Sequence, residues 1–446
     1  SEQSPLSLGT EDIKKLLMRY AVPAIVAMTA ASLYNMMDSI FIGHGVGALG
    51  IAGLAVTFPF INLAAAFGSL VGVGASTLVS VKMGQKDLKS AEAVLGNVLL
   101  LNTVIGFLFM TVCLIFLDPI LYFFGASADT LPYARDYMNV ILIGNVITHM
   151  YLGLNAVLRS SGFPKLAMYA TLASVVINCV LNPLFIFGFG WGIKGSAWAT
   201  VISQVISLTG QLIHFSRPKE LLHFKKGIYR LKSEIVKGIL YIGMSPFLMN
   251  LCACLIVILI NRGLKEHGGD MAIGAYGIVN RVVFLFIMII MGFNQGMQPI
   301  AGYNFGARQY SRVTEVTKLT MKWAIGVATT GFLLCQLFPS VIVRMFTTDP
   351  ELIEAAVYGL HIVFAVFPIV GFQMVATNFF LYIGMSKKAI FLSLTRQMLF
   401  LVPCLLILPR WFGTLGVWIS IPIADTTATI VTALVLINQF RKFHSK

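Results

Sequence analysis

The sequence predicts an all-α polytopic membrane protein with twelve transmembrane helices in two parallel six-helix lobes. Of its 446 residues, 57% are hydrophobic and only 11% are charged, too few charges to cover the surface of a soluble protein of this length. The apolar residues form runs of twenty or more, long enough to cross a hydrocarbon core of about 30 Å. The second half of the chain also repeats features of the first, which accounts for the two lobes.

Apolar runs separated by polar segments define the individual spans. The first run is too long for a secretory signal peptide and no small-residue cleavage site follows it, so it is predicted to be a true span. The twelve spans are predicted at residues 14–42, 51–80, 93–117, 134–158, 165–187, 193–215, 237–262, 273–302, 315–340, 355–381, 388–409 and 414–440.

The basic residues are distributed unevenly between the two sides of the predicted membrane. Because cytoplasmic loops carry the excess of Lys and Arg, both termini are expected in the cytoplasm of a multi-pass inner or plasma membrane protein. The net charge of +14 is thereby explained by loops on one face, and nucleic-acid binding is not expected. The residues counted as cytoplasmic are Lys14, Lys15, Arg19, Lys82, Lys86, Lys89, Arg159, Lys165, those between Arg217 and Lys237, Arg308, Arg312, Lys318, Lys322, Lys387, Lys388, Arg396 and those from Arg441 onwards.

The two halves align when the chain is shifted by half its length. Gly162 and Lys165 then meet Gly384 and Lys387, and each half holds six spans. An even number of spans returns the chain to the same side, so the halves are parallel repeats related by an axis along the membrane normal. The predicted domains are an N-terminal six-helix lobe at 1–215, a cytoplasmic basic linker at 216–236 and a C-terminal six-helix lobe at 237–446.

Two facing six-helix lobes favour a transporter that alternates access by rocking around a central cleft. A channel would more often be an oligomer with a ring-like filter, whereas a monomer is expected here. An intramembrane enzyme would need clustered catalytic groups, but His149 and His361 lie on different spans without motif spacing. The six cysteines match no metal site either, so no enzyme, metal or covalent cofactor is expected.

Asp38 is the leading candidate for ion coupling. It lies near the end of the first span, with about twenty apolar residues before it. Charged residues inside a bilayer are costly and usually face an interior cavity, where they move ions or protons. The alternative is a structural carboxylate that neighbouring backbone or amide groups satisfy.

Three stretches of the chain resemble the multidrug and toxic compound extrusion (MATE) transporters, and the resemblance extends over essentially the whole sequence. They are Asn35–Gly43 in the first span, Gln298–Ala307 at the end of the eighth and Ile177–Leu184 in the fifth. The pattern is most similar to prokaryotic members whose cation site lies in the N-terminal half. The resemblance implies a cation-coupled exporter of drugs, with H⁺ or Na⁺ as the coupling ion.

Counting depth along the spans places two amides near Asp38. The first and fifth spans both run outward, which puts Asn182 at a similar depth and Asn178 one turn deeper, on the same helix face. A carboxylate with two amides can accept a proton or surround a small cation with oxygen ligands. In similar transporters the second of these positions is often acidic, so Asn182 is a departure that leaves the ion open.

Four further residues are candidates for gating or charge relay: Pro23, Asn35, Arg281 and Asp425. Pro23 permits a kink below Asp38, or simply bends the helix for packing. Arg281 is predicted either to pair with a carboxylate such as Asp38 or to reach outward from the span. Asp425 is either a relay group or a structural hydrogen-bonding group.

Flexible and aromatic side chains are the candidates for the substrate cavity, because they adapt to varied apolar ligands. Most such residues in any span face lipid, so they are proposed as a class. The candidates are Phe247, Met249, Met288, Met291, Phe367 and Gln373.

The function predicted from these features is antiport of small organic cations or amphiphiles against H⁺ or Na⁺ across a lipid bilayer. A first alternative is a flippase for lipid-linked or oligosaccharide substrates with the same architecture. A second is a metabolite carrier of the major facilitator type, for which the loop Gly84–Lys89 is only a loose match.

Overall fold

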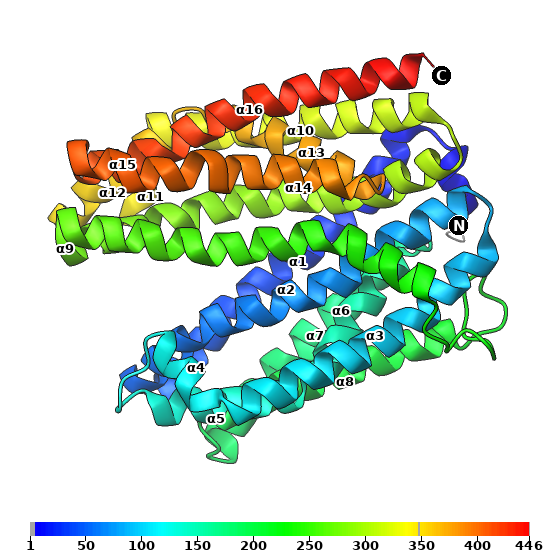
Figure 1. The fold of residues 1–446 in the computed structure, drawn as a ribbon. Coiled ribbons are helices and arrows are strands. Elements are labelled where there is room, and N and C mark those ends of the chain that lie inside the picture. The colour runs from blue at the N-terminus through cyan, green and yellow to red at the C-terminus, as the bar shows by residue number, and fades with distance from the viewer. Residues whose placement is uncertain (1–4, 347, 446) are drawn as a thin grey trace. The chain divides into compact units, whose positions relative to one another are not determined.

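The computed structural model describes residues 5–346 and 348–445, which are almost entirely helical and contain no β-strand (Figure 1). In hydrocarbon, backbone N–H and C=O groups must be paired within the spanning segment, and a helix does this without a partner. The fold class predicted from the sequence is therefore confirmed as all-α.

The first half of the chain forms the helices η1 (Pro5–Gly9), α1 (Ile13–Gly45), α2 (Ala48–Gly84), α3 (Leu88–Ile115), α4 (Leu117–Phe123), α5 (Leu131–Ile143), α6 (Asn145–Ser160), α7 (Pro164–Pro183), η2 (Leu184–Gly188) and α8 (Ile193–Phe215). The second half forms α9 (Ser233–Gly306), α10 (Tyr310–Leu337), α11 (Pro339–Arg344), α12 (Pro350–Val363), α13 (Phe367–Tyr382), α14 (Ser386–Leu394), η3 (Thr395–Leu401), α15 (Val402–Phe412) and α16 (Thr414–His444).

These helices account for the twelve predicted spans. Eight segments are long and apolar enough to cross a membrane, and two bent pairs raise this number to ten. The bent pairs are α5 with α6, at 57°, and α12 with α13, at 56°. The remaining predicted spans correspond to the less apolar helices α8 and α10. The predicted spans 134–158 and 355–381 are thus broken rather than straight, at equivalent places in the two repeats.

The seventh and eighth spans are joined within α9 by a sharp turn at Gly269. Its backbone has φ 67° and ψ −159°, outside the helical region. Only glycine adopts such a conformation without a steric penalty from Cβ, so this residue lets the chain reverse between Ser233–Leu264 and Gly274–Gly306.

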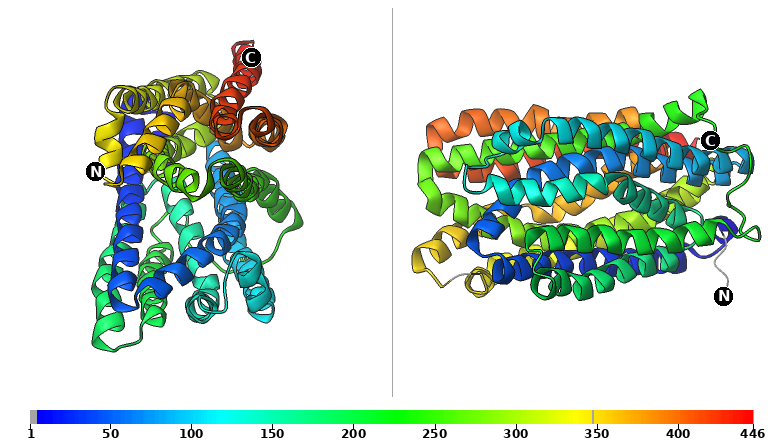
Figure 2. Two further views of the ribbon diagram at one scale, coloured as in Figure 1. Left: turned by 90° about the vertical axis from the view of Figure 1, so that its left-hand side faces the viewer. Right: turned by 90° about the horizontal axis from the view of Figure 1, so that it is seen from below.

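Two compact units make up the chain, and within each the long helices run nearly parallel (Figure 2). Unit 1 contains Val26–Asn250, whereas unit 2 contains Asp12–Ile25, Leu251–Phe305 and the chain from Gln309 onwards. The first helix of each repeat is therefore divided, because the start of α1 packs in unit 2 and the start of α9 packs in unit 1. The predicted lobe boundaries follow the sequence repeat and stay a prediction.

Close backbone approaches hold these helix starts in place. A Cβ on Gly243 of α9 would collide with the carbonyl oxygen of Leu70 in α2, within unit 1. A Cβ on Gly296 would collide with Ala21 of α1, within unit 2. Small residues at such crossings allow the helix–helix contacts that drive association in membranes.

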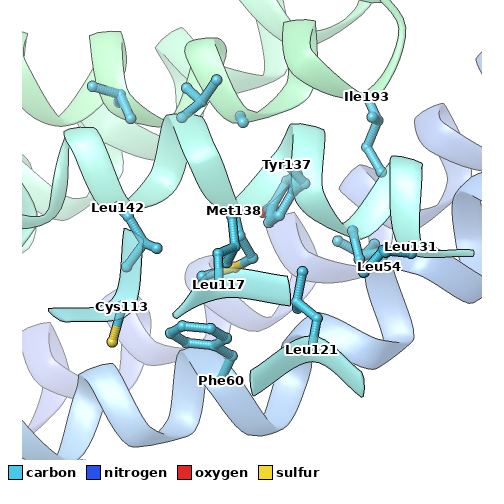
Figure 3. Close-up of a cluster of buried hydrophobic side chains, with 14 of the residues drawn as sticks. Leu54, Phe60, Cys113, Leu117, Leu121, Leu131, Tyr137, Met138, Leu142 and Ile193 are labelled. Carbon is cyan, nitrogen blue, oxygen red and sulfur yellow. The ribbon is translucent and has the colours of Figure 1, made fainter. Parts of the chain in front are cut away.

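A hydrophobic cluster in unit 1 fixes the helices around α5 (Figure 3). Phe60 packs edge-on against Phe109 with ring centroids 6.3 Å apart, and Tyr137 and Met138 of α5 are buried beside them. Cys113 is a free thiol buried inside this cluster, where it packs as a small apolar side chain. Ile193 and Ala197 extend the cluster to the start of α8, which positions the site described below.

The segment between α8 and α9 is attached to unit 1. Lys225 Nζ lies 2.7 Å from Glu92 Oε1 on α3. Asn97, further along α3, donates to Arg230 O at 3.1 Å and accepts from Lys232 N at 3.2 Å. The predicted basic linker is therefore attached to α3 by specific hydrogen bonds and an ion pair.

Candidate functional site

Asp38 lies buried where α1, α7 and α8 meet, with 6% of its surface exposed. Asn182 Nδ2 on α7 and Ser196 Oγ on α8 both donate to the same carboxylate oxygen, Oδ1, each at 2.5 Å. One carboxylate oxygen thus links three helices of unit 1. Charge-assisted hydrogen bonds of this kind are shorter and stronger than those between neutral groups.

A second hydrogen-bonded group centres on Thr200, one turn after Ser196 on α8. Its hydroxyl lies 3.0 Å from the Tyr34 hydroxyl and 3.2 Å from Asn178 Nδ2. The same hydroxyl lies 3.2 Å from the carbonyl oxygen of Ser196, to which it donates. Thr200 thereby joins Tyr34 of α1 and Asn178 of α7 to α8, one turn away from the bonds that Asp38 makes with Asn182 and Ser196.

The local sequence explains why these side chains converge. Each helix contributes two residues four positions apart, which lie one above the other on one face. The three pairs are Tyr34 with Asp38, Asn178 with Asn182, and Ser196 with Thr200. The predicted neighbourhood of Asp38, Asn178 and Asn182 is therefore present in the structure, although Asn178 reaches Thr200 rather than Asp38.

Two amide oxygens of α7, on the helix face that carries the Asp38 contact, have no hydrogen-bond partner. They are Oδ1 of Asn178 and Oδ1 of Asn182, and both are buried. A buried acceptor without a partner is unfavourable by about 1–3 kcal/mol, and such groups are rare in native structures. Together with Asp38 they form a set of oxygen atoms that suits a proton or a hard monovalent cation.

The described residues contain no group of three or more His, Cys, Asp or Glu able to hold a metal ion. A site for a transition metal, which favours sulfur and imidazole ligands, is therefore not found in the described part of the chain.

The other predicted gating residues lie apart from this cluster. Asn35 is on an exposed face of α1, and Pro23 is buried within the part of α1 that belongs to unit 2. Arg281 is exposed on α9 in unit 2, whereas Asp38 belongs to unit 1, so their pairing stays a prediction.

Asp425 forms an ion pair that the sequence analysis did not anticipate. Arg396 Nε lies 2.7 Å from Asp425 Oδ1, and the carboxylate side chain is only 5% exposed. The assignment of Arg396 to the cytoplasmic charges was wrong, because it lies in the π-helical segment η3, inside the span Ser386–Phe412. An arginine at this depth needs a counter-charge, and Asp425 supplies it.

The candidate substrate residues are spread over both units. Phe247 and Met249 lie on the part of α9 in unit 1, where the Phe247 ring is 5.1 Å from that of Phe67. Phe367 is buried in unit 2 against Phe364, at 4.5 Å between ring centroids. Gln373 is also buried, whereas Met288 and Met291 are half-buried, and the substrate role of all six stays a prediction.

The sequence did not lead us to Ser196 or Thr200 as members of this cluster, nor to the hydrogen bond between Tyr34 and Thr200. A signal was present, because the sixth span begins at the side where the fifth ends. Ser196 and Thr200 therefore stand at the depth of Asn182 and Asn178, four residues apart.

The all-helical fold, with its long apolar segments and a carboxylate buried between three of them, is that of a polytopic membrane protein. The MatE family model matches residues 23–184 and 242–406, once in each half of the chain. The protein therefore belongs to the MATE family of multi-pass membrane transporters and is not an enzyme.

Curated relatives match along nearly the whole chain. The multidrug export protein MepA of Staphylococcus aureus (strain N315) is 28% identical over 426 residues, which cover 95% of this chain and 93% of MepA. MepA of Staphylococcus haemolyticus (strain JCSC1435) is 28% identical over 428 residues, with the same coverage of each chain.

Solved structures match over the complete fold. The MATE multidrug transporter DinF-BH, solved with a bound compound, is 37% identical with a TM-score of 0.91 over 100% of both chains. An outward-facing MATE family transporter of the MOP superfamily has a TM-score of 0.93 at 24% identity, over 99% of both chains. These similarities establish twelve helices in two six-helix lobes as the fold of this protein.

Proposed function

We propose that this protein is a secondary active antiporter that exports small organic cations and amphiphilic drugs in exchange for H⁺ or Na⁺. The observation that carries the proposal is the buried Asp38 carboxylate, which accepts hydrogen bonds from α7 and α8, together with the unpaired amide oxygens of Asn182 and, one turn away on α7, of Asn178. The cargo is suggested by the relatives, since MepA is a multidrug export protein and DinF-BH is a multidrug transporter.

The coupling step follows from the charge of Asp38. An ionised carboxylate is a strong acceptor and holds Asn182 of α7 and Ser196 of α8 against α1. A proton or a sodium ion on Asp38 removes its negative charge and weakens both bonds. The amide oxygens of Asn178 and Asn182 supply the remaining acceptors, either for the new O–H group or as ligands to the ion.

Transport then requires that ion binding and substrate binding favour different arrangements of the two lobes. Parallel-repeat transporters expose a central site alternately by rocking one half against the other. Loosening α1 from α7 and α8 changes the N-terminal lobe in which the ion binds. The basic residues predict that both termini lie in the cytoplasm of a plasma-membrane protein. In this orientation, movement of H⁺ or Na⁺ into the cell drives export of the drug.

The test is efflux of ethidium, a fluorescent organic cation, from loaded cells and its uptake into everted vesicles under an imposed proton or sodium gradient. Wild-type protein is compared with Asp38→Asn, which keeps the shape of the side chain and removes its charge. Asp118→Asn is the matched control, because Asp118 is a carboxylate of the same unit that pairs with Arg135 and is 44% exposed.

The proposal expects transport under one of the two gradients, loss of that transport in Asp38→Asn, and normal transport in Asp118→Asn. Both variants are compared for membrane abundance and monodispersity, so that a folding defect is recognised. Gradient-driven efflux by Asp38→Asn at the wild-type rate would sink the assignment of Asp38. No ethidium movement under either gradient would sink the assignment of organic cations as cargo, and a flippase assay with lipid-linked substrate would come next.

A further inference from the structure

A groove in unit 2 lies between the start of α14 and the last third of α16. It has a volume of about 470 Å³. Lys387, Lys388 and Phe391 line it from α14, and Leu434, Val435, Asn438 and Lys442 line it from α16. Both helices belong to segments long and apolar enough to span a membrane, Ser386–Phe412 and Thr414–His444.

The charge of the groove is entirely positive. Three of its seven lining residues are lysines, and no carboxylate lines it. Lys388 Nζ is held by Gln439 Oε1 at 2.6 Å and lies 5.6 Å from the centre of the Phe380 ring. No carboxylate among the residues that the structure describes lies within ion-pair distance of Lys388 or Lys442.

Helix stability does not account for the two lysines on α14. They occupy the first turn of that helix, which contains no acidic residue. A positive charge near a helix N-terminus is unfavourable with respect to the helix dipole. The position of Lys388 next to Lys442 therefore favours an external anion as the counter-charge of this pair.

The groove changes from charged to apolar along both helices. On α16, Lys442, Asn438 and Leu434 are spaced four residues apart, so they follow one helix face from the helix end toward its middle. On α14, Phe391 lies one turn beyond the lysines. Phe391 is 49% exposed and Leu434 is 66% exposed, as expected of side chains that face acyl chains.

The dimensions match one amphipathic molecule. The eight residue steps from Leu434 to Lys442 correspond to about 12 Å of helix, the length of a phosphoglycerol headgroup with the first acyl carbons. Lysine ammonium groups bind phosphate as point charges, and basic pockets between transmembrane helices bind anionic lipid headgroups. A small anion would use the lysines but leave the apolar half of the groove empty.

We propose that this groove is a binding site for an anionic glycerophospholipid, with its phosphate between Lys388 and Lys442 and an acyl chain along Phe391 and Leu434. The lipid joins α14 to α16 at the membrane surface on the side of the C-terminus. The site is separate from the Asp38 cluster, since it lies in the other unit. It holds whether or not Asp38 couples transport to an ion.

The test measures lipid binding to the purified full-length protein by native mass spectrometry and by thermal unfolding. Phosphatidylglycerol is compared with phosphatidylcholine of the same acyl chains, and with inorganic phosphate. The test variant is Lys388→Gln with Lys442→Gln. The matched control is Lys165→Gln with Lys322→Gln, two exposed lysines of the same predicted membrane side that do not line the groove.

Wild-type protein is expected to bind phosphatidylglycerol more tightly than phosphatidylcholine and to unfold at a higher temperature with it. The test variant should bind phosphatidylglycerol about 30-fold more weakly, from roughly 1 kcal/mol per lysine at an anionic surface. The control variant should behave as wild type. Lys388→Arg with Lys442→Arg should keep the preference, which separates lost charge from misfolding.

Four results would overturn the proposal. Equal affinity of the wild type for the two lipids would remove the role of the anionic headgroup. An unchanged preference in the test variant, or the same loss in the control variant, would place the lipid elsewhere. Stabilisation by inorganic phosphate equal to that by phosphatidylglycerol would make the groove a site for a free anion.

Discussion

Asn182 Nδ2 lies 2.5 Å from Asp38 Oδ1, at the point where α7 ends and the π-helical segment η2 begins. The wider π-helical turn at Leu184–Gly188 starts two residues after Asn182. Such turns occur often at functional sites, where they alter the direction of side chains within a helix. The contact between Asn182 and Asp38 therefore joins α1 to a part of the fifth span whose helical geometry changes.

Ser196 is expected to stabilise the charged form of Asp38. Replacing Ser196 with Ala removes one of the two donors to Oδ1, and hydrogen bonds to charged groups contribute about 1.5–3 kcal/mol. We expect Ser196→Ala to lower the thermal unfolding midpoint of the wild type. The loss should be much smaller in an Asp38→Asn background, where the acceptor carries no charge.

Ser203→Ala is the matched control for this double-mutant cycle. Ser203 is a buried serine of the same helix that donates to Thr200 O instead of Asp38. If Ser196→Ala destabilises the wild type and Asp38→Asn equally, the bond to the carboxylate contributes no coupling energy.

Variants of the Arg396–Asp425 ion pair test whether Asp425 is a structural carboxylate or a relay group in transport. Asp425→Asn leaves Arg396 without its counter-charge inside a span, and removing one member of a buried pair costs about 3–5 kcal/mol. We expect a loss of stability of about 3 kcal/mol, the lower end of this range, because the Arg396 side chain is 29% exposed and solvent partly compensates its charge. Thermal unfolding in detergent measures this loss.

The double variant Arg396→Gln with Asp425→Asn then separates the two roles. It removes both charges, so stability should return toward that of the wild type. If the pair is purely structural, ethidium efflux returns with stability. Recovered stability without efflux would assign Asp425 to the transport cycle.

The twelve spans were predictable because hydrocarbon selects for long apolar helices, a requirement visible in composition alone. The bends that break two of these spans were not predicted from the sequence. No proline lies at the 57° bend between α5 and α6. Pro368 lies in the first turn of α13, directly after the 56° bend, and it permits a break without specifying the angle.

Depth counting was enough to group Asp38 with Asn182, because both are rare polar residues in apolar spans. It missed Thr200 for a physical reason. Hydroxyl side chains in transmembrane helices commonly bond a carbonyl of their own helix, as Thr200 does with Ser196, so they resemble local structure in the sequence. Arg396 was counted with the cytoplasmic charges although it lies eight residues inside the predicted span 388–409.

Asp87, which lies outside the spans, is expected to make a pH-dependent contribution to the stability of the protein. It caps the N-terminus of α3, accepting from Ser90 N at 3.2 Å and from Ser90 Oγ at 2.7 Å. These hydrogen bonds lower the pKa of the Asp87 carboxyl below its usual value. The stabilisation is therefore complete above the unfolded-state pKa near 3.9 and is lost as pH falls through the lower folded-state pKa.

Asp87→Asn is expected to keep the cap without this pH dependence, since Asn and Asp cap equally well. The difference in unfolding midpoint between wild type and Asp87→Asn should be constant above about pH 5. At about pH 3 the wild type should lose stability relative to Asp87→Asn. Asp87→Ala should lose about 1 kcal/mol at neutral pH. A constant difference at all pH values would show that the carboxylate charge does not contribute.

Asn97 is expected to hold the linker against α3. Its amide donates to Arg230 O and accepts from Lys232 N, so Asn97→Ala leaves two linker backbone groups without partners. The expected loss is about 2 kcal/mol, from two hydrogen bonds of typical strength. Because the linker is rich in Lys and Arg, trypsin should cut it faster in Asn97→Ala than in the wild type.

Asn155→Ala is the control for this experiment, because Asn155 is a buried amide of the same unit that donates to Thr171 rather than to the linker. It should lower stability without accelerating cleavage between the halves. Lys225→Gln removes the ion pair to Glu92 and one cleavage site together, so its products are compared at the remaining basic residues. Equal cleavage rates in Asn97→Ala and Asn155→Ala would mean that global unfolding, rather than release of the linker, exposes the chain to the protease.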